Sequence, residues 1–145
     1  MSTTSRWGQT PRQSIDTACA MRGRDGVVTG CIDLLGGRDV DATLIRSLGG
    51  PRAARFLDAA PPQRYWLRVW GARGLLWAWD DRATPALISA LDDEAWRVRE
   101  MAAKVVARHL VGDALSRVAP LQEDPVPRVR AAAARAVARL ARAGA

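Results

Sequence analysis

Cationic side chains recur in this sequence at a fixed interval, and they are the residues best suited to binding chemistry. Arg73, Lys104 and Arg135 follow one another at intervals of 31 residues. Two further series share this interval and begin with tryptophan: Trp66, Arg97 and Arg128, and Trp77, Arg108 and Arg139. Cations bind phosphate or carboxylate groups, and aromatic rings stack on nucleic-acid bases. The sequence therefore predicts a binding surface made of these side chains.

Residues suited to catalysis or metal binding are scarce. His109 is the only histidine, and it falls on an apolar helical stripe, where we expect it to have a packing role. Cys19 and Cys31 are the only cysteines and no Cys-x-x-Cys pair is present. We therefore expect two buried thiols, with neither a disulfide framework nor a zinc site. The sequence predicts no catalytic residue, no metal and no cofactor.

The charge balance bears on the class of partner. The chain has 145 residues and a net charge of +7, and Lys104 is the only lysine among its 22 basic residues. Such an excess favours a polyanionic partner, because clustered cations release counterions from phosphates. GC-rich coding, which enriches both arginine and alanine, explains part of the same excess without a partner. Nucleic acid is thus one candidate ligand.

Composition indicates one folded domain. Hydrophobic residues make up 48% of the chain and charged residues 26%, the balance of a globular protein rather than a disordered one. Residues 1–13 are expected to form a flexible arm, which lacks the apolar stretch of a secretory signal. The longest apolar run, residues 75–79, is too short to cross a bilayer. We expect residues 14–145 to form a single soluble, cytoplasmic domain with no membrane contact.

An internal repeat must position the cations. Segments 86–110 and 117–141 align without a gap, which places Asp93 on Asp124 and Val98-Arg99 on Val129-Arg130. A third copy includes residues 64–79, a degenerate one lies near 44–48, and the clearest repeats are 51–80, 82–111 and 113–142. Each copy predicts two helices. The expected helices are 14–21, 27–35, 41–48, 51–59, 64–79, 84–91, 94–110, 114–121 and 125–142.

Helical spacing also separates buried from exposed positions. The residues expected to be buried are Leu75, Val98, Val106, Val129, Val137 and Trp70. The residues expected to be exposed are Arg97, Lys104, Arg108, Arg128, Arg135 and Arg139.

An aspartate-led turn followed by Val-Arg and an alanine-rich helix resembles the HEAT-repeat family, particularly its short bacterial form. The motif appears as Asp93 with Val98-Arg99 and as Asp124 with Val129-Arg130. The resemblance implies an all-α fold, a right-handed α-solenoid of about four antiparallel helix pairs whose second helices line the concave side. It also implies that Asp93, Arg99, Asp124 and Arg130 tie adjacent repeats together. In the third copy Arg68 is present, but Pro62 replaces the aspartate.

The resemblance leaves several functions open. We expect first a non-enzymatic scaffold that binds a protein partner through the concave face, and second a nucleic-acid-binding module that uses the cation series. A third possibility is similarity to HEAT-like DNA glycosylases, with a candidate set of Trp66, Trp77, Asp80, Asp81 and Arg73. The remaining alternative is an ordinary solvated helix face. The sequence does not fix the oligomeric state.

Overall fold

The computed structural model describes residues 8–144, and its regular elements are all helical. The α-helices are α1 (Pro11–Arg22), α2 (Arg24–Leu35), α3 (Ala42–Gly49), α4 (Tyr65–Gly74), α5 (Thr84–Ala90), α6 (Trp96–His109), α7 (Leu115–Val118) and α8 (Pro127–Gly144). The 3-10 helices are η1 (Ala53–Asp58), η2 (Pro61–Gln63), η3 (Asp81–Ala83), η4 (Gly112–Ala114) and η5 (Ala119–Glu123). Within the described residues, no helix has the length and apolar character needed to cross a membrane.

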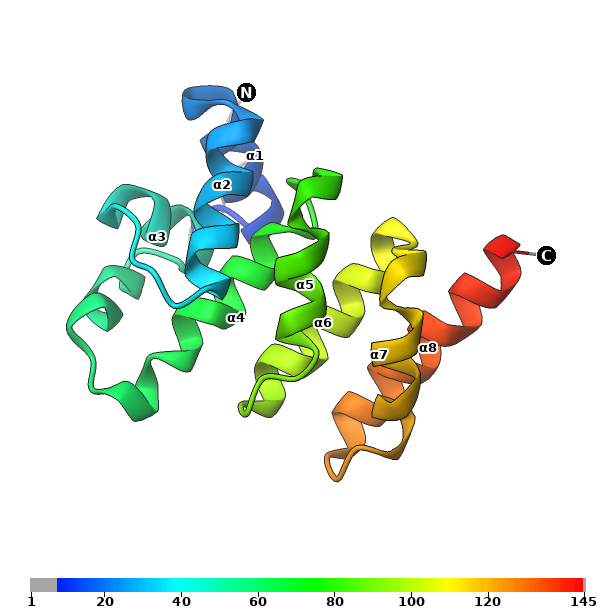
Figure 1. Cartoon of the computed structure of the whole chain (residues 1–145). Helices are drawn as coiled ribbons and strands as arrows, with labels where there is room; N and C mark the ends of the chain where they lie inside the picture. Colours follow the sequence, from blue (N-terminus) through cyan, green and yellow to red (C-terminus); the bar gives the residue numbers. More distant parts are fainter. Residues whose placement is uncertain (1–7, 145) are drawn as a thin grey trace.

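The helices form two layers (Figure 1). In one layer α2 packs against α5, and α5 and α7 both contact η4. In the other layer α4 packs against α6, and α6 packs against α8. The two layers are joined because α2 covers α4, α5 covers α6 and α7 covers α8. The all-α solenoid predicted from the sequence is confirmed.

The N-terminal end is built from helices that are paired out of chain order. α1 packs on both α2 and α3, whereas α4 packs on both α2 and α3. α1 and α3 are antiparallel, because Ser14 Oγ donates to the Ser47 carbonyl while Arg22 near the other end forms two hydrogen bonds with Asp41. These bonds from Arg22 hold the pKa of Asp41 well below its usual range. The first helix beside α4 is therefore α2, rather than a helix at 51–59.

Several expected helices differ from the observed ones for local reasons. Residues 53–58 form the 3-10 helix η1 instead of an α-helix, since α2 already occupies the place beside α4. α4 ends at Gly74, ahead of the expected residue 79, and glycine has a poor helix propensity. α7 passes into η5 near Pro120, which lacks an amide donor. α1 begins at Pro11, where Thr10 and Gln13 form a capping box. The rest of the predicted arm, residues 1–7 including Trp7, lies outside the described residues.

Two glycines allow α4 to approach α2 closely. A Cβ atom added at Gly71 would lie 2.9 Å from the Cβ of Leu34 and 3.0 Å from the carbonyl oxygen of Cys31. At Gly74 it would lie 2.5 Å from the sulfur of Cys31, which is fully buried. All three distances are shorter than ordinary van der Waals contacts. The close crossing of α2 and α4 therefore requires glycine at both positions.

The core follows the repeat pattern with one exception. Leu75, Val98, Val106 and Val129 are fully buried and Trp70 is 8% exposed, as expected. Val137 on α8 packs against the core but is less completely buried than the equivalent valine of the preceding repeat. Its position 31 residues earlier, Val106, lies in α6 between α4 and α8, whereas α8 packs on α6 and α7.

Removing two methyl groups from Val98 should destabilise the fold. Val98→Ala is expected to lower the free energy of unfolding by about 1–3 kcal/mol, because the fully buried site cannot collapse onto the cavity. Urea denaturation followed by circular dichroism measures this change. Val137→Ala is the matched control, and it should cost less than half as much since this valine is only partly buried. Equal losses at both positions would contradict the layer assignment.

Candidate functional site

Two arginine–aspartate pairs connect successive second helices to the turns of the following repeats. Arg68 Nε lies 2.7 Å from Asp93 Oδ2, and its Nη2 lies 3.1 Å from Oδ1. Arg99 makes the same forked contact with Asp124, at 2.8 and 3.2 Å. Each pair spans 25 residues of sequence. A two-bond contact of this kind fixes orientation as well as distance.

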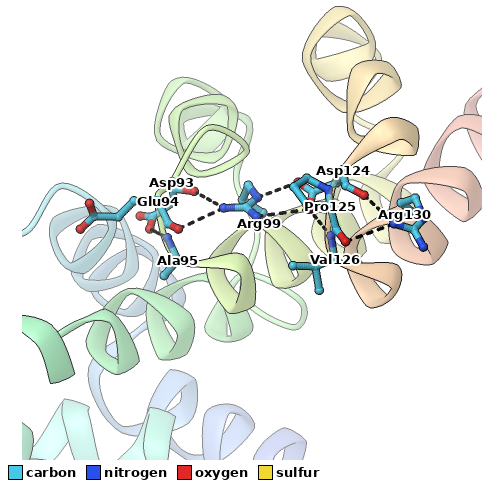
Figure 2. A network of polar contacts seen from close by, with 8 residues as sticks. All are labelled: Asp93, Glu94, Ala95, Arg99, Asp124, Pro125, Val126 and Arg130. Carbon is cyan, nitrogen blue, oxygen red and sulfur yellow. Dashed lines mark hydrogen bonds and ion pairs between the residues drawn. The ribbon is translucent and has the colours of Figure 1, made fainter.

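Arg99 and Arg130 also bind backward to the turn of their own repeat, as Figure 2 shows. Arg99 Nη1 donates to the carbonyl oxygens of Asp93 and Glu94, at 2.8 and 3.1 Å. Arg130 repeats these contacts with the carbonyl oxygens of Asp124 and Pro125, at 2.8 and 3.2 Å. Arg130 makes only the backward contacts, and no carboxylate of the described residues pairs with it. Pro62 replaces the turn aspartate in the repeat of Arg68. Arg68 still pairs with Asp93, the turn aspartate of the following repeat.

The aspartates use their remaining capacity to shape the turns. Asp93 Oδ1 accepts a hydrogen bond from the Ala95 amide at 2.8 Å, and Asp124 Oδ1 accepts one from the Val126 amide at 2.9 Å. Each carboxylate thus closes the turn before a second helix and receives the arginine of the preceding repeat. This arrangement joins the repeats into one chain of polar contacts.

A hollow between α6 and α8 gathers four cations of the predicted surface. Its volume is about 230 Å³, and its lining residues are Leu76, Lys104, Ala107, Arg108, Ala132, Arg135 and Arg139. Lys104 and Arg108 come from α6, whereas Arg135 and Arg139 come from α8. Arg108, Arg135 and Arg139 are exposed, as predicted. No aspartate or glutamate lines this hollow.

A second hollow between α4 and α6 contains cations that are already occupied. Arg97 lies with its Cζ atom 5.3 Å from the ring centre of Trp66 and 4.4 Å from that of Trp96. Arg128 lies 5.3 Å from the ring of Trp96, and its Nε atom is 2.9 Å from the carboxylate of Glu100. The expectation that Arg97 is exposed is wrong, because it covers two indole rings and is only half-exposed.

Lys104 stands between the two hollows and lines both. Its Nζ atom lies 3.8 Å from Glu100, one helical turn earlier. The expectation that Lys104 is exposed is wrong, because its side chain lies against the buried Glu100 and the residue is only partly exposed. The Glu100 carboxylate therefore forms ion pairs with both Lys104 and Arg128.

Arg73 departs from the predicted alignment with Lys104 and Arg135. Its Nη2 group donates to the carbonyl oxygen of Leu48 at the end of α3, and its Nε atom is buried without a partner within the described chain. Burial lowers the pKa of Arg73. The cause is the neighbouring α3 helix, which lies outside the clear repeats. Arg73 lines the α4–α6 hollow, but its guanidinium is bound to the carbonyl oxygen of Leu48 on α3.

The two tryptophans of the predicted surface have structural neighbours. Trp66 stacks on Trp70 with ring centres 6.2 Å apart, and Arg97 lies over its ring. Trp77 packs against the core, partly buried, and lines neither hollow. Neither ring therefore presents an open platform beside the unpaired cations.

The residues considered for a glycosylase-like centre do not converge. Asp80 accepts a hydrogen bond from the Arg82 amide, and Asp81 accepts one from the indole of Trp79. Neither aspartate lines the hollow that contains Trp66 and Arg73. Among the described residues, no cluster of three or more His, Cys, Asp or Glu side chains is arranged to hold a metal ion.

His109 is engaged in packing between repeats. Its Nε2 atom lies 2.7 Å from the carbonyl oxygen of Leu75, and its ring stacks on Trp79 with centres 4.7 Å apart. Burial is the main cause that lowers the pKa of His109, and it outweighs the carbonyl contact. A neutral ring that donates to Leu75 fits this environment.

The Asp-turn contacts and the stacked helix pairs accord with the comparison of the chain to known families. The sequence model of the family described as HEAT repeats matches residues 53–138. The chain belongs to the HEAT-repeat family. No curated protein and no solved structure matches it. HEAT repeats generally act as protein-interaction scaffolds.

Two residues that contact the predicted cations were not among the predicted site residues. Trp96 carried no site prediction, but Arg97 and Arg128 both lie over its ring. Glu100 carried no prediction, although its spacing of four residues before Lys104 was a readable signal for an ion pair. Together, Trp96 and Glu100 engage Arg97, Lys104 and Arg128, which are three of the seven cations of the predicted surface.

The ion pair between Arg99 and Asp124 makes the free energy of unfolding depend on the charge of Asp124. Burial alone would raise the pKa of this carboxyl group, but hydrogen bonds from Arg99 and the Val126 amide and the charges of Arg99 and Arg130 hold it below its usual value. A carboxyl group with a lowered folded-state pKa stabilises the fold above its unfolded pKa, near 3.9. This contribution is lost as the pH falls through the folded-state value.

Asp124→Asn should therefore cost about 3 kcal/mol at pH 7, since it leaves the Arg99 cation without its counter-charge. The loss should shrink below about pH 4, where the carboxyl group begins to protonate in the unfolded wild-type chain while it stays charged in the folded one. Chemical denaturation at pH 7 and pH 3 gives both values. Asp113→Asn is the control and should change little, because this aspartate is exposed and forms no ion pair or hydrogen bond with the described residues. An unchanged loss at pH 3 would show that charge is not the cause.

Proposed function

We propose that this chain is a non-enzymatic binding module that engages a protein partner through the face formed by α4, α6 and α8. The observation that supports the proposal is the α6–α8 hollow, where Arg135 and Arg139 are exposed and form no ion pair or hydrogen bond within the described chain. Elsewhere in the solenoid, arginines of the same helices meet carboxylates. Cations left without counter-charges mark the place where an external ligand is expected.

Family membership supports a protein as the ligand. The same face offers apolar and small side chains beside the cations, including Leu76, Ala107 and Ala132. A protein partner contacts both kinds of surface, since interfaces combine an apolar centre with charged edges. We place this interaction in the cytoplasm, in keeping with the reduced state of Cys19 and Cys31.

Nucleic acid is the second candidate, supported by the net charge of +7 and the unpaired arginines. Two contacts weigh against it. Arg73 is bound to Leu48, which interrupts the row of cations, and Trp66 is covered by Arg97. A phosphate backbone would thus lose both its continuous row and its stacking platform.

The proposal is tested by capture from the native cell extract with and without nuclease. We expect the immobilised protein to retain a defined set of proteins, and nuclease to leave that set unchanged. The variant Arg97→Glu/Arg108→Glu/Arg139→Glu should lose at least 80% of the retained material, because it reverses charge across the face. Quantitative mass spectrometry measures retention.

The matched control reverses exposed arginines away from this face. Arg24 begins α2 and Arg52 precedes η1, and neither lines the two hollows. Arg24→Glu/Arg52→Glu should retain the same proteins as the wild type. Loss of all material after nuclease would instead support nucleic acid, and retention that is equal for both variants would exclude this face as the binding surface.

A further inference from the structure

We infer that the hollow between α6 and α8 is a docking site for an acidic segment of a partner protein, in which carboxylates flank an apolar side chain. This inference rests on the proposed function and adds the location and chemistry of the contact. The occupant is identified by three features of the hollow: its three arginines that form no ion pair within the described chain, its floor of small apolar side chains, and the lack of an aromatic residue in its lining.

The cations form two pairs that face the hollow from neighbouring helices. Lys104 and Arg108 lie one turn apart on α6, and Arg135 and Arg139 lie one turn apart on α8. Arg108 Nε donates to the carbonyl oxygen of Leu76 at 3.0 Å, which holds the side chain in place. Its two terminal nitrogens form no hydrogen bond or ion pair with the described residues. Side chains on both walls can therefore receive carboxylates without large rearrangement.

The difference from the adjacent hollow lies in one repeat position. Lys104 has Glu100 one turn before it, and this carboxylate also binds Arg128. Arg135 occupies the equivalent position of the next repeat, but Ala131 stands one turn before it. The α4–α6 hollow thus contains its own counter-charge and the α6–α8 hollow lacks one. A carboxylate from outside would take the place that Glu100 has in the preceding repeat.

The floor of the hollow favours a peptide over a free anion. Ala107 and Ala132 are 4% and 5% exposed, and Leu76 is partly buried beside them. Small side chains on facing helices leave room for one aliphatic group, and the arginine stems extend this apolar surface. A volume of about 230 Å³ suits a few side chains and not a folded domain.

Nucleic acid fits the hollow less well. Base stacking needs an accessible ring, but no aromatic residue lines this site. The nearest cations along the predicted row are engaged, since Arg128 binds Glu100 and Arg73 binds Leu48. The available charge is therefore a compact cluster, which matches a short run of carboxylates.

The experiment uses a fluorescein-labelled ten-residue peptide, Glu-Glu-Leu-Glu-Glu-Leu-Glu-Gly-Gly-Ser, and the full chain. Fluorescence anisotropy should show saturable binding at 50 mM salt. Arg135→Gln/Arg139→Gln should weaken it about 10-fold through loss of two charge-assisted contacts. Ala131→Glu should weaken it about 3-fold, because the new glutamate neutralises Arg135 from one turn away while every native cation remains.

Three controls separate the causes. Ser116→Glu adds the same charge on α7, in the opposite layer, and should change the affinity less than 2-fold. Replacing both leucines of the peptide by serine should weaken binding at least 5-fold if the apolar floor takes part. Circular dichroism should show unchanged helical content in every variant.

The outcomes distinguish this inference from the proposed function. Absence of saturable binding by the wild type, or equal affinity for Ala131→Glu and wild type, overturns the docking site. A single-stranded oligonucleotide of equal charge that binds more tightly than the peptide also overturns it in favour of nucleic acid. If the peptide fails while extract proteins are still retained through this face, the proposed function stands and this inference alone is wrong.

Discussion

The forked pairs of Arg68 with Asp93 and Arg99 with Asp124 determine how the helix pairs stack. Apolar stripes pull neighbouring helices together, but hydrophobic attraction has no direction and permits sliding. A guanidinium that binds a carboxylate in one repeat and turn carbonyls in its own fixes both the rise and the rotation between them. Buried ion pairs add little net stability over apolar packing, so their contribution here is to register. The positions of the cations on α6 and α8 follow from that register.

Register turns a difference of one side chain into a difference between two surfaces. The repeat places Lys104 and Arg135 in equivalent positions, and Glu100 and Ala131 in another equivalent pair. Because Glu100 is buried between two cations, the α4–α6 hollow contains its own counter-charge. Because Ala131 has no charge, the α6–α8 hollow has no such counter-charge. Repetition thus supplies a common frame, and departures from the repeat give each groove its own chemistry.

The sequence predicts what is periodic and misses what is not. The burial of Val98 and Val129 follows from a 31-residue repeat, since equivalent positions meet equivalent neighbours. The contact between Arg99 and Asp124 was implied by the resemblance to HEAT repeats and not by the spacing. The alignment failed for Arg73, whose neighbour is the end of α3, an element outside the clear repeats. It failed for the helix expected at 51–59 for the same reason, because the pairing of α2 with α4 is a contact between distant segments. Which arginines are neutralised depends on side-chain geometry that spacing alone does not specify.

The out-of-order pairing of α2 with α4 has a consequence for the way the chain acquires its structure. α5 and α6 are joined by residues 91–95, so they can meet as soon as both are made. α2 ends at Leu35, but α4 begins only at Tyr65, and residues 36–64 must close as a loop before the two helices touch. Loop closure costs entropy before any contact repays it, which slows folding. During synthesis on the ribosome, the surface of α2 that packs on α4 therefore stays exposed to solvent until α4 has emerged. Exposed apolar surface promotes aggregation, so we expect the N-terminal half of the solenoid to be the part most prone to aggregate during folding.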